Sequence, residues 1–204
     1  NIKPEQFAIA LGIPTTAADG SPIDILNFNP FSSDADPEAA LAVEKAGQQV
    51  MVTIQAVSAA AEGAGMSVEQ AFQQAMESVS EVVSATAATI DVSSPEAVSA
   101  AENAIASGEL TKIDLSGSSF LGAVSEGVKA KVAEAAIADK TIIIDETAFA
   151  SVLVTAMTAV SNVISAIEAI TDTDLNSTAS KGIFSTLAEI SSEIKLAAES
   201  EVVS

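Results

Sequence analysis

Residues 147–167 read TAFASVLVTAMTAVSNVISAI and carry no charged side chain, although 18% of the whole chain is charged. Apolar residues recur there at alternating steps of four and three, which is the spacing of one buried helix face. We call this set the apolar seam: Phe149, Leu153, Ala156, Val160, Val163, Ile167 and Ile170. A second set, the polar stripe, repeats at the same spacing on another side: Ser151, Thr155, Thr158, Asn162 and Ser165.

A charge-free helix of this length either spans a membrane or forms the centre of a helical bundle. Hydroxyl and amide side chains interrupt this one, and the chain has no Trp or Tyr to anchor a span at the membrane interface. No lysine cluster flanks the stretch, and other segments with helical apolar spacing can cover it. We therefore expect a core helix over about 147–171 and no membrane span.

The composition excludes several classes of function. The chain has 28 acidic and 8 basic residues in 204, a net charge of -20, and nucleic acid binding would need clustered basic residues. Without His or Cys it lacks the ligands of ordinary zinc, copper, haem and iron–sulfur sites, and the groups for thiol or Ser-His-Asp catalysis. Carboxylate and carbonyl oxygens remain, and these are the ligands that calcium uses. Because like charges repel, we expect a monomer at low salt.

The chain divides into an arm and a bundle. Five of the six prolines lie at or before Pro37, so residues 1–36 are expected to form an extended arm, with a short helix at 3–11, that packs on the bundle through its Phe side chains. Residues 37–204 are expected to form a single helical bundle. The predicted class is all-α: a multi-helix bundle around the central apolar helix, with a wrapped N-terminal arm.

Helix starts in the bundle are marked by capping residues. Asp36-Pro37, Ser67 with Gln70, and Ser94-Pro95 open three helices, and two further helices are expected at 119–138 and from about 178. Residues 110–115 and 140–145 either pair as a small ribbon or form apolar loops, and we favour loops. In the helix after Ser67, the expected buried set is Val68, Phe72, Ala75, Val79, Val82 and Thr86.

One turn has the rhythm of calcium ligands. Asp172, Asp174 and Asn176 follow the D-x-D-x-N pattern that begins a calcium loop, but Gly and Glu are missing at its sixth and twelfth places. The other interpretation, which the residues favour, is a polar turn that caps the last helix. Calcium is thus the one candidate ion and no cofactor is expected. Asp34-Ala-Asp36 and Asp19-Gly20 are similar oxygen-rich turns, for which capping is favoured more strongly.

Catalysis has little support in the residues. Ser125 and Lys129 lie one helical turn apart and could form a Ser-Lys dyad, but this spacing is ordinary on exposed helices. Pairs of carboxylates for sugar chemistry would be expected in a cleft lined by aromatics, and only 3% of residues are aromatic. We therefore expect that the protein is not an enzyme.

Residues 11–57 combine Leu11-Gly12-Ile13-Pro14, the turn Asn29-Pro30-Phe31 and an Ala/Val/Gln helix from Ala40 to Val57. This stretch, about a quarter of the chain, resembles an Ala-rich helical segment of very large, acidic, calcium-binding bacterial surface proteins of the RTX and cadherin-repeat adhesin type. The resemblance implies an extracellular or cell-surface location. The glycine–aspartate nonapeptide repeats that define RTX modules are absent from this sequence.

Together these observations favour a non-catalytic, extracellular helical spacer or interaction module of a large bacterial surface or secreted protein. The start at Asn1 suggests a segment of a longer protein or a mature chain. Its partners would be neighbouring domains of that chain, and a protein or cell-surface partner. The alternative is a helical binding protein that holds a small apolar ligand between its helices.

Overall fold

The computed structural model describes residues 2–139 and 146–171, and within these ranges it contains six helices and no strand. They are α1 (Pro4–Ala10), α2 (Pro37–Gly63), α3 (Val68–Ala87), α4 (Pro95–Ser107), α5 (Ser118–Ala138) and α6 (Glu146–Glu168). Residues 110–115 form a loop, tied to α1 by a hydrogen bond of 2.8 Å from Ile113 N to Ala10 O. The predicted all-α bundle is confirmed. The predicted last helix and residues 140–145 lie outside the described ranges.

The helices begin and end where the capping chemistry predicts. The Asp36 carboxylate accepts hydrogen bonds from the backbone N–H groups of Glu38 and Ala39 at the start of α2. Ser67 and Gln70 form the expected capping box of α3, and Gly108, with a φ of 77°, ends α4 in the left-handed conformation. These local signals set the helix boundaries before any tertiary contact is considered.

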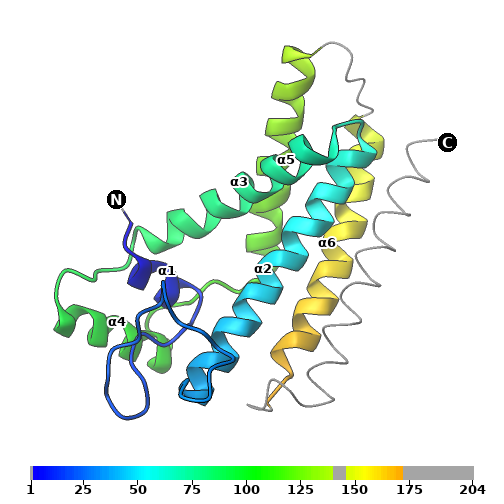
Figure 1. Cartoon of the computed structure of the whole chain (residues 1–204). Coiled ribbons are helices and arrows are strands. Elements are labelled where there is room, and N and C mark those ends of the chain that lie inside the picture. Colours follow the sequence, from blue (N-terminus) through cyan, green and yellow to red (C-terminus); the bar gives the residue numbers. More distant parts are fainter. Residues whose placement is uncertain (1, 140–145, 172–204) are drawn as a thin grey trace.

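The bundle is organised around the packing of α2 with α6. These two helices lie side by side and run in opposite directions, and α5 runs alongside in the same direction as α2 (Figure 1). The whole apolar seam of α6 is buried in the core against these neighbours, from Phe149 to Ile170. The central-helix prediction is confirmed residue by residue on this face.

Helix α2 is buried on more than one side, because it packs extensively on α6 and α3 and also contacts α5. A single apolar seam would predict burial of only one face. Its second half is buried on most sides, and the buried residues there are mainly small. Three consecutive alanines, Ala59, Ala60 and Ala61, are at most 6% exposed. Small side chains let three helices approach one helix closely.

The predicted buried face of α3 is wrong at its N-terminal end. Val68 is 64% exposed and Phe72 is 41% exposed, whereas Ala71 and Ala75 are completely buried. Ala75 and Val79 are buried as predicted, whereas Val82 and Thr86 are only partly buried and Val83 and Ala87 are buried beside them. The predicted and the observed buried sets both have helical spacing, so periodicity alone does not distinguish them. The structure buries the smaller residues because α3 crosses close to α2 there, and the larger side chains are left outside.

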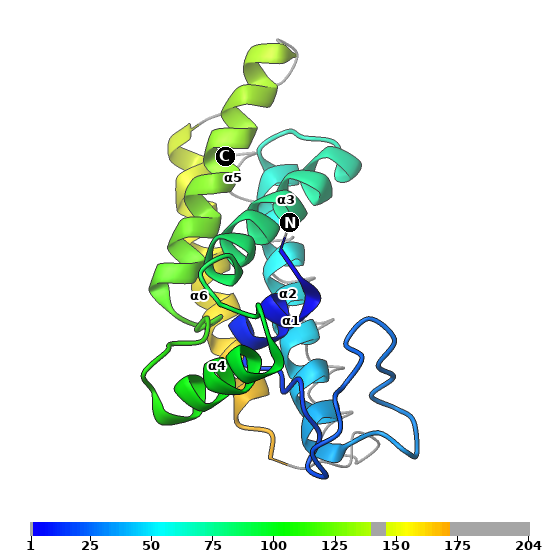
Figure 2. The same ribbon diagram turned by 90° about the vertical axis from the view of Figure 1, so that its left-hand side faces the viewer.

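The N-terminal arm is attached through a few defined contacts. α1 buries Ala8 and Ile9, and the Glu102 carboxylate on α4 accepts hydrogen bonds from both N and Oγ1 of Thr15, each 2.7 Å long. Residues 17–35 then form a loop that projects from the bundle (Figure 2). The expected anchoring by Phe side chains is wrong for Phe31, which is 58% exposed, because the loop is fixed by polar contacts at its ends instead.

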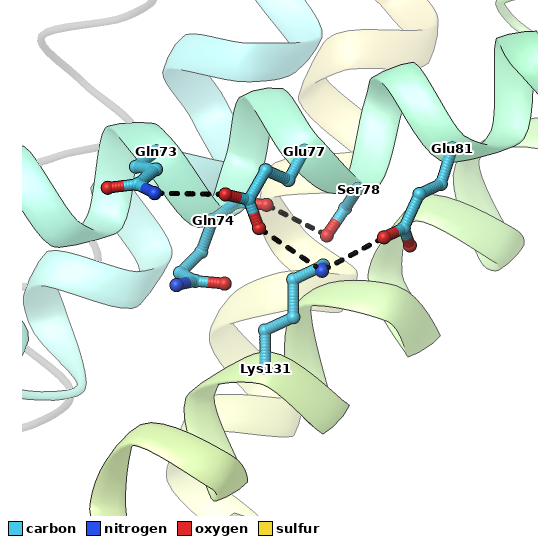
Figure 3. Close-up of polar contacts among 6 residues, drawn as sticks. All are labelled: Gln73, Gln74, Glu77, Ser78, Glu81 and Lys131. Carbon is cyan, nitrogen blue, oxygen red and sulfur yellow. Dashed lines mark hydrogen bonds and ion pairs between the residues drawn. The ribbon is translucent and has the colours of Figure 1, made fainter.

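Helices α3 and α5 are joined by a polar cluster (Figure 3). Lys131 of α5 reaches two carboxylates of α3, with its Nζ 3.0 Å from Glu81 Oε1 and 3.3 Å from Glu77 Oε2. Next to it, a Cβ added at Gly127 would lie 3.3 Å from Cβ and Oγ of Ser78. The glycine permits the close approach, and the lysine neutralises the acidic surface that the approach brings together.

Helix α6 passes a simple length and hydropathy test for a membrane span, the one helix among the described residues to do so. Its most apolar window, within Phe149–Glu168, has a mean hydropathy of 1.7, and 44% of that window is buried in the bundle. A core helix of a bundle passes the same test when its buried face is apolar.

Truncating the seam should destabilise the bundle. We expect Leu153→Ala to lower the free energy of unfolding by about 2–5 kcal/mol, because Leu153 is completely buried and its loss leaves a cavity. Val154→Ala, at the neighbouring position that is 66% exposed, should change it by less than about 0.5 kcal/mol. Urea unfolding followed by circular dichroism measures both, and equal effects of the two substitutions would contradict the described packing.

The ion pairs of Lys131 with Glu77 and Glu81 should stabilise the fold to an extent that depends on salt and pH. Lys131→Gln should lower the urea midpoint at neutral pH and low salt more than Lys129→Gln does, because the one ion pair of Lys129 among the described residues is with Glu126 on its own helix. One molar NaCl should narrow the difference between wild type and Lys131→Gln.

Lowering the pH should also narrow the difference in urea midpoint between wild type and Lys131→Gln. A hydrogen bond from Gln73, helped by Lys131, lowers the pKa of Glu77, so its contribution is present above the unfolded pKa and is lost as the pH falls through the folded one. The Glu81 and Glu77 carboxylates raise the pKa of Lys131, so its contribution persists until strongly alkaline pH. A stability difference that stays constant from neutral pH down to pH 3 would argue against this cluster.

Candidate functional site

The polar stripe of α6 lies on the surface. All five of its residues are exposed, on the side of α6 opposite the apolar seam. Three hydroxyls donate to backbone carbonyls four residues earlier on α6: Thr155 to Ser151 at 3.2 Å, Thr158 to Val154 at 2.9 Å and Ser165 to Ser161 at 2.9 Å. Their hydrogens are therefore used within the helix, and their oxygens face outward as acceptors.

A groove of about 570 Å³ runs between α5 and α6 beside this stripe. α6 contributes Thr158 and Asn162 of the stripe, together with Val154, Met157 and Ser161. From the loop before α5 and from α5 itself come Ser116, Ser118, Leu121, Gly122, Ser125, Glu126 and Lys129. α6 packs far less extensively on α5 than on α2, and the groove lies between α5 and α6. Ser151, Thr155 and Ser165 lie on the open helix face outside it.

The groove has mainly uncharged polar walls, with the Glu126–Lys129 ion pair at one end, and an apolar floor. Leu121 and Met157 are buried at its base, and no atom lies within 4 Å of a Cβ added at Gly122, so the wall there is open. Ser161 Oγ donates a 3.1 Å hydrogen bond to Ser116 O, which fixes the loop before α5 against α6. Such a surface can take a partner without the cost of dehydrating many charges.

The Ser125 and Lys129 pair is present at one end of this groove, but not as a dyad. Ser125 is buried, and the Lys129 ammonium forms an ion pair of 2.8 Å with Glu126 Oε1. No hydrogen bond links Ser125 to Lys129 in the described structure. A lysine held by a carboxylate is poorly placed to activate a serine hydroxyl.

The oxygen-rich turns of the arm are occupied by capping interactions. Besides capping α2, Asp36 accepts a 3.0 Å hydrogen bond from Ala18 N, and this bond is the main reason that the pKa of Asp36 is lowered. Ser21 donates from both N and Oγ to Asp19, which lowers the pKa of that carboxyl too. Among residues 2–139 and 146–171, no three Asp or Glu residues come together in a group that could hold a metal ion.

The candidate calcium ligands Asp172, Asp174 and Asn176 lie outside the described residues. Their arrangement is therefore a prediction from the sequence alone.

Comparisons with known proteins give no assignment. No family model, curated protein or solved structure matches this chain.

A second, more apolar pocket of about 620 Å³ lies further along α5 and α6. Its walls include the buried residues Val132 and Phe149 and several alanines, while Glu126, Lys129 and Glu146 form a polar rim. This pocket has the size and lining that a small apolar ligand would need.

Sequence reasoning found the α6 side of the groove and missed the α5 side. A usable signal was present, since Ser118, Gly122 and Ser125 repeat at steps of four and three, as the polar stripe does. The sequence gives no indication that the stripe on α5 and the polar stripe on α6, about forty residues apart, lie on either side of one groove. That depends on how α5 and α6 both pack on α2.

Proposed function

We propose that this chain is a non-catalytic helical spacer or interaction module of a large secreted or surface-attached bacterial protein, of adhesin-like type. The observation that carries the proposal is the exposed polar stripe of α6 beside its groove with α5. On a protein of net charge -20, the uncharged stripe offers a partner little repulsion and a small dehydration cost.

The remaining parts of the proposal have independent support. An acidic, Cys-free composition suits an extracellular or cell-surface location, and the resemblance of residues 11–57 to RTX and cadherin-repeat adhesin segments agrees with it. Neighbouring domains of a longer chain would be its covalent partners. The acidic surface disfavours nucleic acid and self-association at low salt. Packing of the apolar seam on α2 supports a bundle helix over a membrane span.

The interaction surface can be tested by adding charge to it. Labelled protein titrated onto intact bacteria and onto cultured epithelial cells should bind saturably. The double variant Thr158→Glu with Asn162→Glu should bind at least tenfold more weakly, because it places buried charge in the contact. Flow cytometry gives both curves.

The matched control is Ser99→Glu with Asn103→Glu, which adds the same two charges at the same spacing on the exposed face of α4. Its binding should stay within about twofold of wild type. Equal losses from both double variants, or no saturable binding to either cell type, would count against the proposed surface.

We also propose that Asp172, Asp174 and Asn176 bind calcium. Millimolar calcium should raise the Tm by several degrees, whereas the same concentration of magnesium should not. Magnesium is smaller than calcium and requires stricter octahedral coordination. Asp172→Asn with Asp174→Asn should abolish the rise. Asn caps helices as well as Asp does, so this variant would leave a purely capping turn intact. If calcium leaves the Tm unchanged, the chain has no such calcium site.

The alternative function is binding of a small apolar ligand, and the observation that favours it is the apolar pocket between α5 and α6. Saturable binding of a fatty acid at one site per chain, together with no binding to cells, would favour this function over the first.

A further inference from the structure

A third pocket, of about 490 Å³, lies at the opposite end of α6 from its N-terminus. It forms where the turn after α1, one face of α2, the loop before α5 and the last residue of α6 meet. Its lining residues are Leu11, Gly12, Ala42, Lys45, Ala46, Gln49, Lys112, Asp114, Ser116 and Glu168. None of these belongs to the polar stripe, and only Ser116 is shared with the α5–α6 groove.

Two lysines face this pocket, and neither has a carboxylate oxygen within 4 Å among the described residues. Lys45 Nζ donates a 3.0 Å hydrogen bond to the backbone oxygen of Glu168 at the end of α6 and is within 4 Å of no described carboxylate oxygen. Lys112 forms neither a hydrogen bond nor an ion pair with the described residues. By contrast, Lys129 and Lys131 both pair with glutamates.

The two ammonium groups are close enough for their charges to interact. Burial lowers the pKa of Lys45; the nearby Glu168 carboxylate opposes this shift, and the positive charge of Lys112 adds to it. In a chain with 28 acidic residues, two lysines that share a pocket and repel each other are unusual. An anion between them would remove the repulsion.

The side chain of Lys112 lies across the turn at Gly12. Gly12 has a φ of +72°, and a Cβ there would lie 2.6 Å from Lys112 Cδ. The positive φ favours glycine here, and a larger residue would push the exposed Lys112 stem away from this turn.

Gln49 supplies an independent indication of a ligand. It is only 6% exposed, it lines the pocket, and its side-chain amide has no hydrogen-bond partner among the described residues. No fully enclosed polar side-chain atom of these residues is left unpaired, so the amide must open into the pocket. The amide is therefore available to hydrogen-bond to a molecule bound in the pocket.

We propose that this pocket binds the carboxylate of a small organic acid between Lys45 and Lys112, with the Gln49 amide N–H as a third donor. Leu11, Ala42 and Ala46 provide an apolar wall for the body of the acid. This site is independent of the proposed interaction surface on α6.

The surroundings favour a single negative charge over a phosphate. The α6 C-terminus, with its partial negative charge, and the carboxylates of Asp114 and Glu168 also border the pocket. Asp114 is held in its own turn by hydrogen bonds from N and Oγ of Ser116. A dianion would meet more repulsion from these groups than a carboxylate does.

The test is an NMR titration of the folded chain with butyrate, with NaCl adjusted to hold the ionic strength constant. The Gln49 side-chain amide and the backbone amides of Gly12 and Ser116 should shift along one saturable curve. Lys112→Gln should weaken binding about tenfold, because it removes one charged hydrogen bond. Lys3→Gln, the same charge change on a lysine that bonds to Val92 O outside the pocket, should leave binding unchanged.

Several outcomes would overturn the proposal. One is a change in the amide chemical shifts that increases linearly with butyrate, without saturation, and that butanol or added NaCl also produces. Another is equal weakening by Lys112→Gln and Lys3→Gln, which would indicate a general charge effect. Tighter binding of inorganic phosphate than of butyrate would overturn the choice of a carboxylate. Because Lys112 is exposed, its variant should fold normally, and an unchanged urea midpoint would verify that.

Discussion

The close packing of α2 against α6 is the contact on which the rest of the molecule depends. α6 contributes one fully buried seam, and α2 contributes small residues on several sides, so that α3 and α5 can reach the same core. Aromatic residues are only 3% of the chain, and the core is filled mainly by Ala, Val, Ile and Leu. With little bulk available per residue, the helices must come close together to exclude water. That requirement explains why Ala71 and Ala75 are buried while Phe72 is left outside.

Electrostatics sets a second constraint. At a net charge of -20, each lysine has a large effect on its surroundings. Lys131 joins α3 to α5, Lys45 bonds to the end of α6, and Lys3 bonds to the backbone near the start of α4. The described lysines thus lie mostly where elements meet. The polar stripe is uncharged by contrast, and this is why it stands out as a surface for another molecule.

Much of the fold could be predicted because its signals are local. Capping residues bond to backbone groups within one helical turn, so the sequence alone predicts the helix starts at Asp36, Ser67 and Ser94. The apolar seam of α6 likewise follows a single helical spacing, which identifies its buried face. The buried face of α3 was not predictable in the same way, because Val68 and Ala71 compete at equal spacing and only the distance to α2 decides between them. The groove and the Lys45–Lys112 pocket depend on residues far apart in the chain, and no local pattern brings these together.

The attachment of α4 has a consequence for how the molecule opens. This helix has no fully buried residue, and Glu102 on it holds Thr15 of the arm. Its partly buried Val98 and Ile105 join a small cluster with Ile9 and Ile90 that is separate from the main core. α4 packs on α1 and on no other described helix, whereas α1 itself packs more on α3 than on α4. The amides of α4 should therefore exchange with solvent at a lower opening free energy than those of α2 and α6.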